Sequence, residues 1–352
     1  MPILHRYLAR LFVGRLLLLM GGFAALVLLL DLIGNGADVL EKSGHQIEAL
    51  LRYMALRLPE IVSALVPFSV LLAGIATLAS LVRHSELVAM RAAGISQVLL
   101  IKALMPVALL VAVPQFWLEN DLLPASVAEL RAWGVGEYES DGERSAVWAR
   151  VGEDIVRVGA VQGADAVADI TIFRRDARGN MIEQWSADRG VFEAGRWTLL
   201  DVVRSRAEAR APTRLASDEW AGELSPSLLA SLSTHPRELA VTELKRFVGD
   251  EGFGNRPHYL YAVWLHKKLS APFATILMLL ISVPLIQGLH RRAGTALMLA
   301  AGVAIGFSFL VFDGLILKFG EAGLLPPILA AWGPTVIFAM VAASLAFRTE
   351  LH

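Results

Sequence analysis

Long apolar stretches and short alternating runs divide this sequence into three parts. Six stretches are each long enough to cross a bilayer, which takes about 20 helical residues. They cover residues 11–33, 59–82, 97–118, 269–289, 295–317 and 326–347. Between the third and the fourth stretch, apolar and polar residues alternate in short runs instead. The pattern predicts three membrane-spanning helices, a β domain and three more membrane-spanning helices.

The first apolar stretch has a secretory signal as its alternative interpretation, because His5, Arg6 and Arg10 precede a leucine run. That run is longer than the usual signal core of about 7–15 residues, and no small-residue cleavage pattern follows it. We therefore interpret it as a retained span.

An amphipathic segment follows at residues 34–58, where Leu40, Ile47, Leu50 and Leu58 recur at helical spacing. It either lies on the outer membrane surface or lengthens the first helix beyond the bilayer, and we favour the interfacial helix. Pro59 then suits the first turn of the second span. Small residues predict close helix contacts in the spans, namely Ala73, Gly74, Ala76, Ala79, Gly302 and Gly306.

The middle of the chain predicts a β-sandwich or jelly roll, since short alternating runs are separated by glycine-containing turns. The runs are Ser145–Val151, Asp154–Ala160, Val167–Arg174, Met181–Arg189 and Arg196–Val203. Residues 206–214 fit an edge strand or a loop. Helical spacing returns over residues 225–250, with Ser225-Pro226 as its start signal. We expect four tryptophans to fill the interior or line a face, namely Trp148, Trp185, Trp197 and Trp220.

Residues 83–96, RHSELVAMRAAGIS, form a short amphipathic segment that is too charged to span a bilayer. Ser85 can cap a helix, Glu86 lies in the first turn where the helix dipole favours an anion, and Gly94 supplies a C-terminal stop. The apolar side chains fall on two helical faces, Leu87 with Met90 and Val88 with Ala92. A surface helix between two spans is typical of a contact with a partner.

Orientation follows from the bias of arginine and lysine toward cytoplasmic loops. One side collects Arg6, Arg10, Arg15, Arg83, Arg91, Arg291, Arg292 and Arg348. This places both termini and residues 83–96 in the cytoplasm and the β domain outside. Lys267 and Lys268 lie on the outer side against the rule, and we interpret them as interface residues whose ammonium groups reach toward water.

Composition narrows the function classes. Of 352 residues, 55% are hydrophobic and 18% are charged, against about 25% charged in ordinary soluble chains. A net charge of -1 argues against a nucleic-acid partner. The sequence holds no cysteine, which excludes disulfides, cysteine nucleophiles and thiolate metal sites. Its eight histidines are scattered, so we expect no metal site.

Motifs of hydrolytic chemistry are missing from the sequence. It contains no G-x-x-x-x-G-K-[ST] phosphate loop, so the chain cannot hydrolyse ATP by that route, and neither H-E-x-x-H nor G-x-S-x-G occurs. Asp31 and Asp313 fall near the ends of apolar spans, where carboxylates are costly and mark functional sites. One hypothesis is an intramembrane aspartyl protease that uses both, but we favour two interface carboxylates. A third hypothesis is a receptor or scaffold with a ligand-binding β domain. The short cytoplasmic segments argue against it, because they leave no effector domain.

Several segments resemble the lipopolysaccharide export permeases LptF and LptG. They are SELVAMRAAGIS after the second span, K-x-x-x-P at Lys268–Pro272, and GFSFLVFDGLILKFG followed by LPPILAAWGP. The S-E-L-V-x-M form is closer to LptG. The resemblance covers nearly the whole chain, is strongest at residues 83–96 and 264–335, and is weak in the β domain.

The resemblance implies an α-helical membrane protein with six transmembrane helices (3+3) and an inserted extracytoplasmic β-jellyroll-like domain. Residues 1–118 would hold helices 1–3 with a coupling helix at 84–94, residues 119–262 the periplasmic domain, and residues 263–352 helices 4–6. Both termini would be cytoplasmic in a bacterial inner membrane. The implied partners are an LptF-like permease, an LptB-like ATPase dimer that binds ATP and magnesium, LptC- and LptA-like bridge proteins, lipopolysaccharide and membrane lipids, with no cofactor in this chain.

The resemblance also implies roles for residues. The coupling helix would contact the ATPase through Ser85, Glu86, Leu87, Met90, Arg91 and Gly94, with Glu86 paired to an ATPase arginine and Leu87, Met90 and Arg91 seated in a groove. The first and fifth spans would form gates toward the partner permease. Their expected substrate-cavity residues are Leu26, Val27, Leu30, Asp31, Phe307, Leu310, Asp313 and Ile316.

One departure from the family concerns lysines near the outer end of the first span, which suit the phosphates of the substrate. The segment LLLDLIGNGADVLEK holds no cation before Lys42. Either Lys42, Lys267 or Lys268 takes this role, or phosphate pairing is weaker in this chain.

Overall fold

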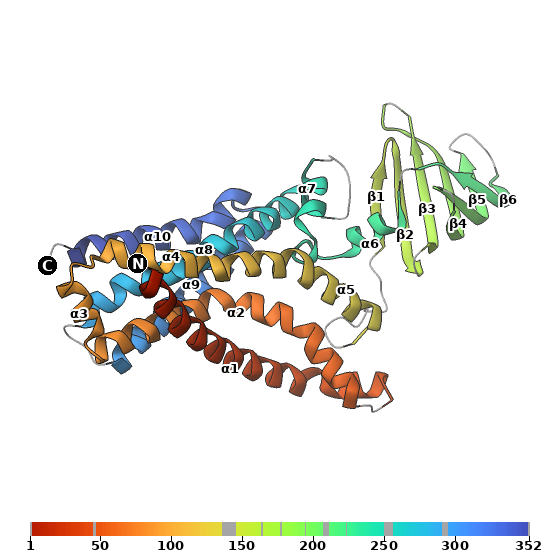
Figure 1. The fold of residues 1–352 in the computed structure, drawn as a ribbon. Helices are drawn as coiled ribbons and strands as arrows, with labels where there is room; N and C mark the ends of the chain where they lie inside the picture. Colours follow the sequence, from red (N-terminus) through yellow and green to blue (C-terminus); the bar gives the residue numbers. More distant parts are fainter. Residues whose placement is uncertain are drawn as a thin grey trace. The chain divides into compact units, whose positions relative to one another are not determined.

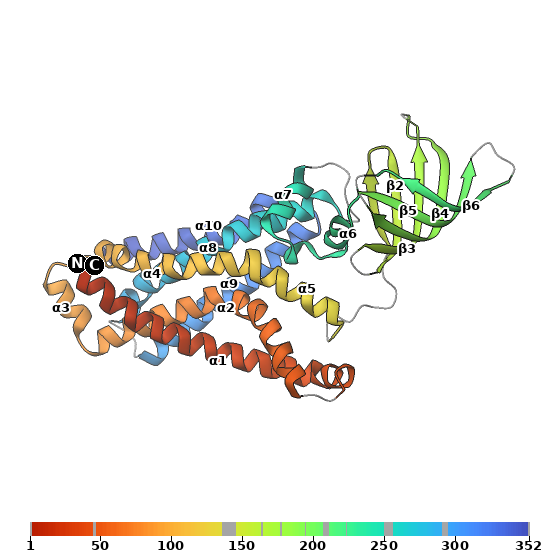
Figure 2. The same ribbon diagram turned by 45° about the vertical axis from the view of Figure 1, so that its right-hand side comes forward.

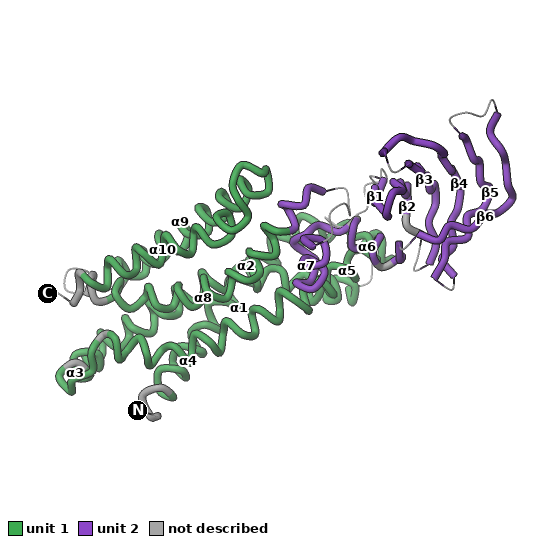
Figure 3. The backbone as a smooth tube through the Cα atoms, turned by 90° about the horizontal axis from the view of Figure 1, so that it is seen from above, with its two compact units in different colours: residues 1–139, 262–352 green, residues 140–261 purple. Residues whose placement is uncertain are grey.

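The computed structural model describes residues 2–44, 47–135, 146–162, 165–176, 178–193, 195–206, 211–222, 224–249, 256–290 and 295–350. The chain divides into two compact units, residues 1–139 with 262–352 and residues 140–261 (Figure 3). Six helices in the described residues are long and apolar enough to cross a membrane. A six-stranded sheet lies between the third and the fourth of these helices. The predicted order of three helices, a β domain and three helices is confirmed.

The helical unit is a bundle of long antiparallel helices. The start of α1, the end of α10 and the short α3 lie at the same end of this bundle (Figures 1 and 2). Its elements are α1 (Pro2–Lys42), α2 (Ile47–Arg83), α3 (Glu86–Ala92), α4 (Gln97–Trp117), the π-helical η1 (Leu118–Leu122), α5 (Leu123–Trp133), α8 (His258–His290), α9 (Thr295–Glu321) and α10 (Pro327–Glu350).

Residues 34–58 do not form a separate interfacial helix, so that interpretation is wrong. α1 continues to Lys42 and α2 begins at Ile47, which places Pro59 inside α2 rather than at its start. The apolar side chains of the two extensions pack against each other and against α5. This cluster contains Val39, Ala49, Tyr53, Leu130 and Val135. The two extensions therefore share a small core with α5.

Glycines bring α2 into close contact with two neighbours, as the small-residue pattern predicts. A Cβ on Gly74 would lie 2.7 Å from the hydroxyl of Ser282 in α8. A Cβ on Gly306 of α9 would lie 2.7 Å from the ring of Phe68, and one on Gly302 would clash with Ile75. α2 therefore packs on α8 through one face and on α9 through another.

Residues just after the third predicted span remain helical. The helix passes through the π-helical turn η1 and continues as α5 to Trp133. The described strands begin only at Val147. Glu119 therefore lies inside a continuous helical segment.

The second unit holds one sheet of six antiparallel strands in sequence order, which forms a jellyroll-like domain (Figure 2). The strands are β1 (Val147–Val151), β2 (Asp154–Gln162), β3 (Ala166–Arg175), β4 (Met181–Glu193), β5 (Arg196–Arg206) and β6 (Thr213–Trp220). Edge strand β6 covers the end of the predicted 206–214 edge segment, and residues 207–210 lie outside the described part. Helix α6 (Pro226–Ser233), the 3-10 turn η3 (Pro236–Glu238) and α7 (Val241–Gly249) follow.

The alternation in the strands buries one face of the sheet, because successive side chains point to opposite sides. Trp185, Trp197 and Trp220 are buried, whereas Trp148 is half exposed and stacks on Phe173. Ser225 caps α6 as predicted, since its hydroxyl accepts the backbone N–H of Leu228 at 3.2 Å.

Candidate functional site

The inner side of α3 is anchored in the helical core. Leu87 is only 4% exposed and belongs to the same cluster as Leu8 and Phe12 of α1 and Leu100 of α4. A side chain buried in this way is not available to a groove on another protein. The burial of Leu87 argues against the expected contact with the ATPase, and Leu87 instead anchors α3 in the helical core.

The outer side of α3 carries the free apolar surface. Val88 is 54% exposed, and Ala89 and Ala92 are exposed beside it. Met90 is half-buried, and the side chain of Arg91 lies outside the described residues. The i, i+4 pair of Val88 and Ala92 in the sequence already indicated this face, although its role was given to the other face.

Two backbone features mark the ends of α3. Gly94 has φ +83° and the N–H of Ile95 donates to the carbonyl of Met90 at 3.0 Å, so the predicted C-terminal stop is confirmed. Ser85 has φ +60°, the left-handed region that non-glycine residues seldom adopt. Its carbonyl accepts the N–H of Ala89 at 3.0 Å. Ser85 thus starts the helix, but without the extended backbone usual for an N-cap.

Glu86 connects α3 to the beginning of α1. The hydroxyl of Tyr7 donates to Glu86 Oε2 at 2.8 Å. Glu86 remains half exposed, and it stands in the first turn of α3. The carboxylate is therefore oriented by this chain while still accessible from outside.

α1 and α9 both pack on α2 at Phe68. The Phe68 ring lies 5.4 Å from that of Phe23 in α1, centroid to centroid, and it faces Gly306 of α9. The expected cavity residues follow on these two helices. Leu26, Leu30 and Phe307 are exposed, whereas Val27, Leu310 and Ile316 are half-buried.

Asp31 is held between α1 and α2. One carboxylate oxygen accepts the hydroxyl of Tyr53 at 2.8 Å, and the other faces Arg57 at 3.3 Å. Arg57 also pairs with Glu60 at 2.5 Å and its side chain is only 9% exposed. Asp31 therefore belongs to a nearly buried ion-pair cluster.

Asp313 has a different partner. Lys267 Nζ of α8 lies 2.6 Å from both of its carboxylate oxygens, and the two side chains are 17% and 15% exposed. Each aspartate is neutralised by its own cation, whereas an aspartyl dyad needs two carboxylates that share one proton. The protease hypothesis is not supported.

The three lysines proposed for phosphate contacts are all engaged. Lys42 binds Asp38 at 3.0 Å and the carbonyl of Gly134 at 2.8 Å. Lys268 is 4% exposed and donates to the carbonyl of Glu119 at 2.7 Å. The prediction that both ammonium groups reach toward water is wrong, because Lys267 is half-buried against Asp313 and Lys268 is buried against the carbonyl of Glu119.

Glu119 forms a polar contact inside the bundle that the sequence did not reveal. Its carboxylate accepts the hydroxyl of Ser63 at 2.8 Å and the side-chain amide of Gln115 at 3.1 Å. Residues from α2, α4 and η1 thus meet through one partly buried carboxylate. Together with Lys268 of α8, this network ties four elements into a fixed core.

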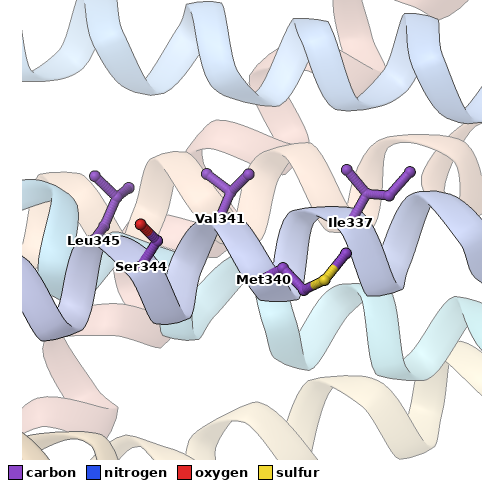
Figure 4. A pocket seen from close by; sticks show the side chains of 5 residues that line it. All are labelled: Ile337, Met340, Val341, Ser344 and Leu345. Carbon is purple, nitrogen blue, oxygen red and sulfur yellow. The ribbon is translucent and has the colours of Figure 1, made fainter.

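A shallow hollow lies on α10, away from the expected cavity residues. Figure 4 shows the five side chains that line it, Ile337, Met340, Val341, Ser344 and Leu345. All come from this one helix, so the hollow is an apolar surface without converging polar groups. Among the described residues, no group of three or more His, Asp or Glu side chains could hold a metal ion.

The two faces of α3 predict different effects of truncation. Leu87→Ala should destabilise the protein by about 2–4 kcal/mol, because it leaves a cavity in the core. Val88→Ala should change stability by less than about 0.5 kcal/mol, since Val88 is exposed. Unfolding of the purified variants in detergent measures both. Equal losses would contradict the inward orientation of Leu87.

Comparison with known proteins gives one consistent result. The family model described as "Lipopolysaccharide export system permease LptF/LptG" matches residues 6–348. The chain is 22% identical over 342 residues to the lipopolysaccharide export system permease protein LptG of Haemophilus influenzae, covering 95% of each chain. It is 25% identical over 328 residues to LptG of Escherichia coli K12, covering 88% of this chain and 89% of the relative.

Proposed function

This chain belongs to the LptF/LptG family of lipopolysaccharide export system permeases, and from this premise we propose that it is the LptG-type half of a permease pair driven by a separate ATPase. Its six apolar helices fit a multi-pass inner-membrane protein. The family match leaves the protease and receptor hypotheses without support.

The proposal rests mainly on the exposed surface of α3. Val88 and Ala92 form an exposed apolar face, while Leu87 and the Tyr7–Glu86 hydrogen bond fix the helix to the bundle. This small apolar face is unfavourable in water and lies beside a carboxylate that is already oriented. Both features favour contact with a protein partner. We propose that an LptB-like ATPase dimer binds here, with an arginine paired to Glu86. ATP and magnesium then belong to that ATPase.

The direction of transport follows from the orientation that we propose. The arginine bias favours cytoplasmic termini and a cytoplasmic α3, which puts the β domain in the periplasm. α1 and α9 then face an LptF-like partner, and Leu26, Leu30 and Phe307 offer apolar surface to acyl chains. Lipopolysaccharide enters between the two permeases, and closure passes it to the β domains and to LptC- and LptA-like bridge proteins.

Co-purification in mild detergent tests the docking surface. Val88→Asp should abolish recovery of the ATPase, because a carboxylate would have to be buried without a partner. The permease itself should stay folded, since Val88 is exposed. Val88→Thr is the matched control, with the same branching and no charge, and should retain most of the ATPase.

Two outcomes of this experiment decide the proposal. Loss of the ATPase with Val88→Asp but not with Val88→Thr, at unchanged permease unfolding temperature, supports it. Full ATPase recovery and wild-type ATPase activity with Val88→Asp would overturn the assignment of α3 as the docking helix.

A further inference from the structure

The π-helical turn η1 leaves one backbone carbonyl without a donor from its own helix. The N–H of Leu123 donates to the carbonyl of Leu118, five residues before it. In a continuous α-helix this N–H would donate to the carbonyl of Glu119 instead. The residue five positions after Glu119 is Pro124, which has no N–H. The carbonyl of Glu119 therefore receives no hydrogen bond at either the α-helical or the π-helical spacing.

Lys268 of α8 supplies the missing donor. Its Nζ donates to the carbonyl of Glu119 at 2.7 Å, and the residue is 4% exposed. A carbonyl without a hydrogen bond is strongly unfavourable in apolar surroundings, where no water replaces the lost partner. The ammonium of Lys268 is thus bound to the same carbonyl that the π-helical turn deprives of its donor.

Pro124 makes the two possible registers of this segment differ in which carbonyl loses its donor. In the π-helical register it is the carbonyl of Glu119, and in a continuous α-helix it would be the carbonyl of Asn120, four residues before the proline. Lys268 donates to Glu119. Its hydrogen bond therefore stabilises the π-helical register relative to the α-helical one.

A second contact from the same face of α8 holds the helix just before the turn. The hydroxyl of Thr275, two helical turns after Lys268, donates to the side-chain oxygen of Gln115 at 2.5 Å. The amide nitrogen of Gln115 in turn donates to the carboxylate of Glu119 at 3.1 Å. α4 is therefore tied to α8 through Gln115, and the change of register falls between this residue and Leu123.

The register decides which face α5 presents to α2. One extra residue in a helix turns all that follows by about 100° and moves it by about 1.5 Å along the axis. In the observed register Glu129 pairs with Arg52 at 2.6 Å, and Leu130 is buried in a cluster with Tyr53. Without the extra residue, Ala128 would take the place of Glu129, and the carboxylate of Glu129 would enter the apolar cluster in place of Leu130.

We propose that Lys268 is a positioning residue, which holds the segment α4–η1–α5 in its π-helical register and so sets the face that α5 presents to α2. The hydrogen bond joins residues 149 positions apart in the sequence. A side chain of α8 thereby determines how a helix of the first half of the chain packs. The inference goes beyond the proposed export function and does not depend on it.

Cysteine cross-linking reports the register in the full-length permease in membranes. The chain has no cysteine of its own, so an introduced pair reacts alone with a short bismaleimide. Arg52→Cys with Glu129→Cys reports the π-helical register, and Arg52→Cys with Ala128→Cys reports the α-helical one; all three positions are exposed. Lys268→Met removes the ammonium but keeps much of the bulk. It should lower the ratio of the first yield to the second about tenfold, the weight of one buried hydrogen bond left unmade.

Three further variants separate the register from a general loss of packing. Lys268→Arg keeps a charged donor and should keep the ratio within about twofold of wild type. Thr275→Val is the matched control, because it removes the other hydrogen bond from the same face of α8 and should leave the ratio unchanged. Pro124→Ala should lower the ratio even with Lys268 in place, since a continuous α-helix then leaves no carbonyl without its donor.

A ratio that falls with Lys268→Met but not with Lys268→Arg or Thr275→Val supports the inference. An unchanged ratio with Lys268→Met overturns it, and so does an equal fall with Thr275→Val, because the register would then not depend on Lys268. If Lys268→Met does not accumulate in the membrane, Pro124→Ala decides, and an unchanged ratio in that variant overturns the inference. The ratio is measured without ATPase or lipopolysaccharide, so failure of the proposed export function would leave this result standing.

Discussion

Lipopolysaccharide export should fall about 30-fold or more when Glu86 is replaced by lysine. Losing one partner of an interfacial charge pair costs about 2–5 kcal/mol. The new lysine would also repel the arginine that we propose on the ATPase. Glu86 is half exposed at the start of α3, where the helix dipole favours an anion. The measurement is ATP-driven transfer of lipopolysaccharide from proteoliposomes, with the bound ATPase quantified in parallel.

Two milder substitutions separate the roles of this carboxylate. Glu86→Gln keeps an oxygen for the hydroxyl of Tyr7 but removes the charge, so its export rate should lie between wild type and Glu86→Lys. Tyr7→Phe removes only the hydrogen bond within the chain and should keep the ATPase bound. Wild-type export by Glu86→Lys would contradict an ion pair at this position.

The order of elements could be predicted from the sequence because its signals are local. Spans of about 20 apolar residues and strands with a period of two are set by the bilayer and by the pleat. Element ends were harder to place, as residues 34–58 demonstrate. An amphipathic helix looks the same whether its apolar face meets a membrane or another helix, and here it meets α5.

Long-range partners explain the errors at the lysines. Lys267 pairs with Asp313, 46 positions away, and Lys268 bonds to a carbonyl 149 positions away. Charged residues at the head of an apolar run suggest an interface, but α8 begins at His258 and carries them inside the bundle. No local pattern in the sequence contains this information.

Helix α3 itself could be found from its end signals, but its orientation could not. Leu87 with Met90 and Val88 with Ala92 are equally good apolar faces in a seven-residue helix. The choice between them depends on Leu8 and Phe12 of α1, which share a core cluster with Leu87. The resemblance therefore assigned the partner contact to the face whose Leu87 is buried.

Removal of the Lys267 ammonium should destabilise the helical unit by about 3–5 kcal/mol, because Lys267→Ala leaves the carboxylate of Asp313 nearly buried without a cation. Replacing both residues by apolar ones, Lys267→Met with Asp313→Leu, should restore stability to within about 1 kcal/mol of wild type or raise it, since no charge then remains in the apolar surroundings. The free energy of unfolding in bicelles measures the difference.

Lys318→Ala is the control for this experiment. It also removes a lysine, but from the exposed ion pair of Lys318 with Glu321 in α9. Its cost should stay below about 1 kcal/mol. A large loss at Lys267 with a small one at Lys318 means that the nearly buried Lys267–Asp313 pair holds α8 on α9, whereas the exposed Lys318–Glu321 pair contributes little. Equal losses would contradict the prediction that burial makes the Lys267–Asp313 pair costly to break.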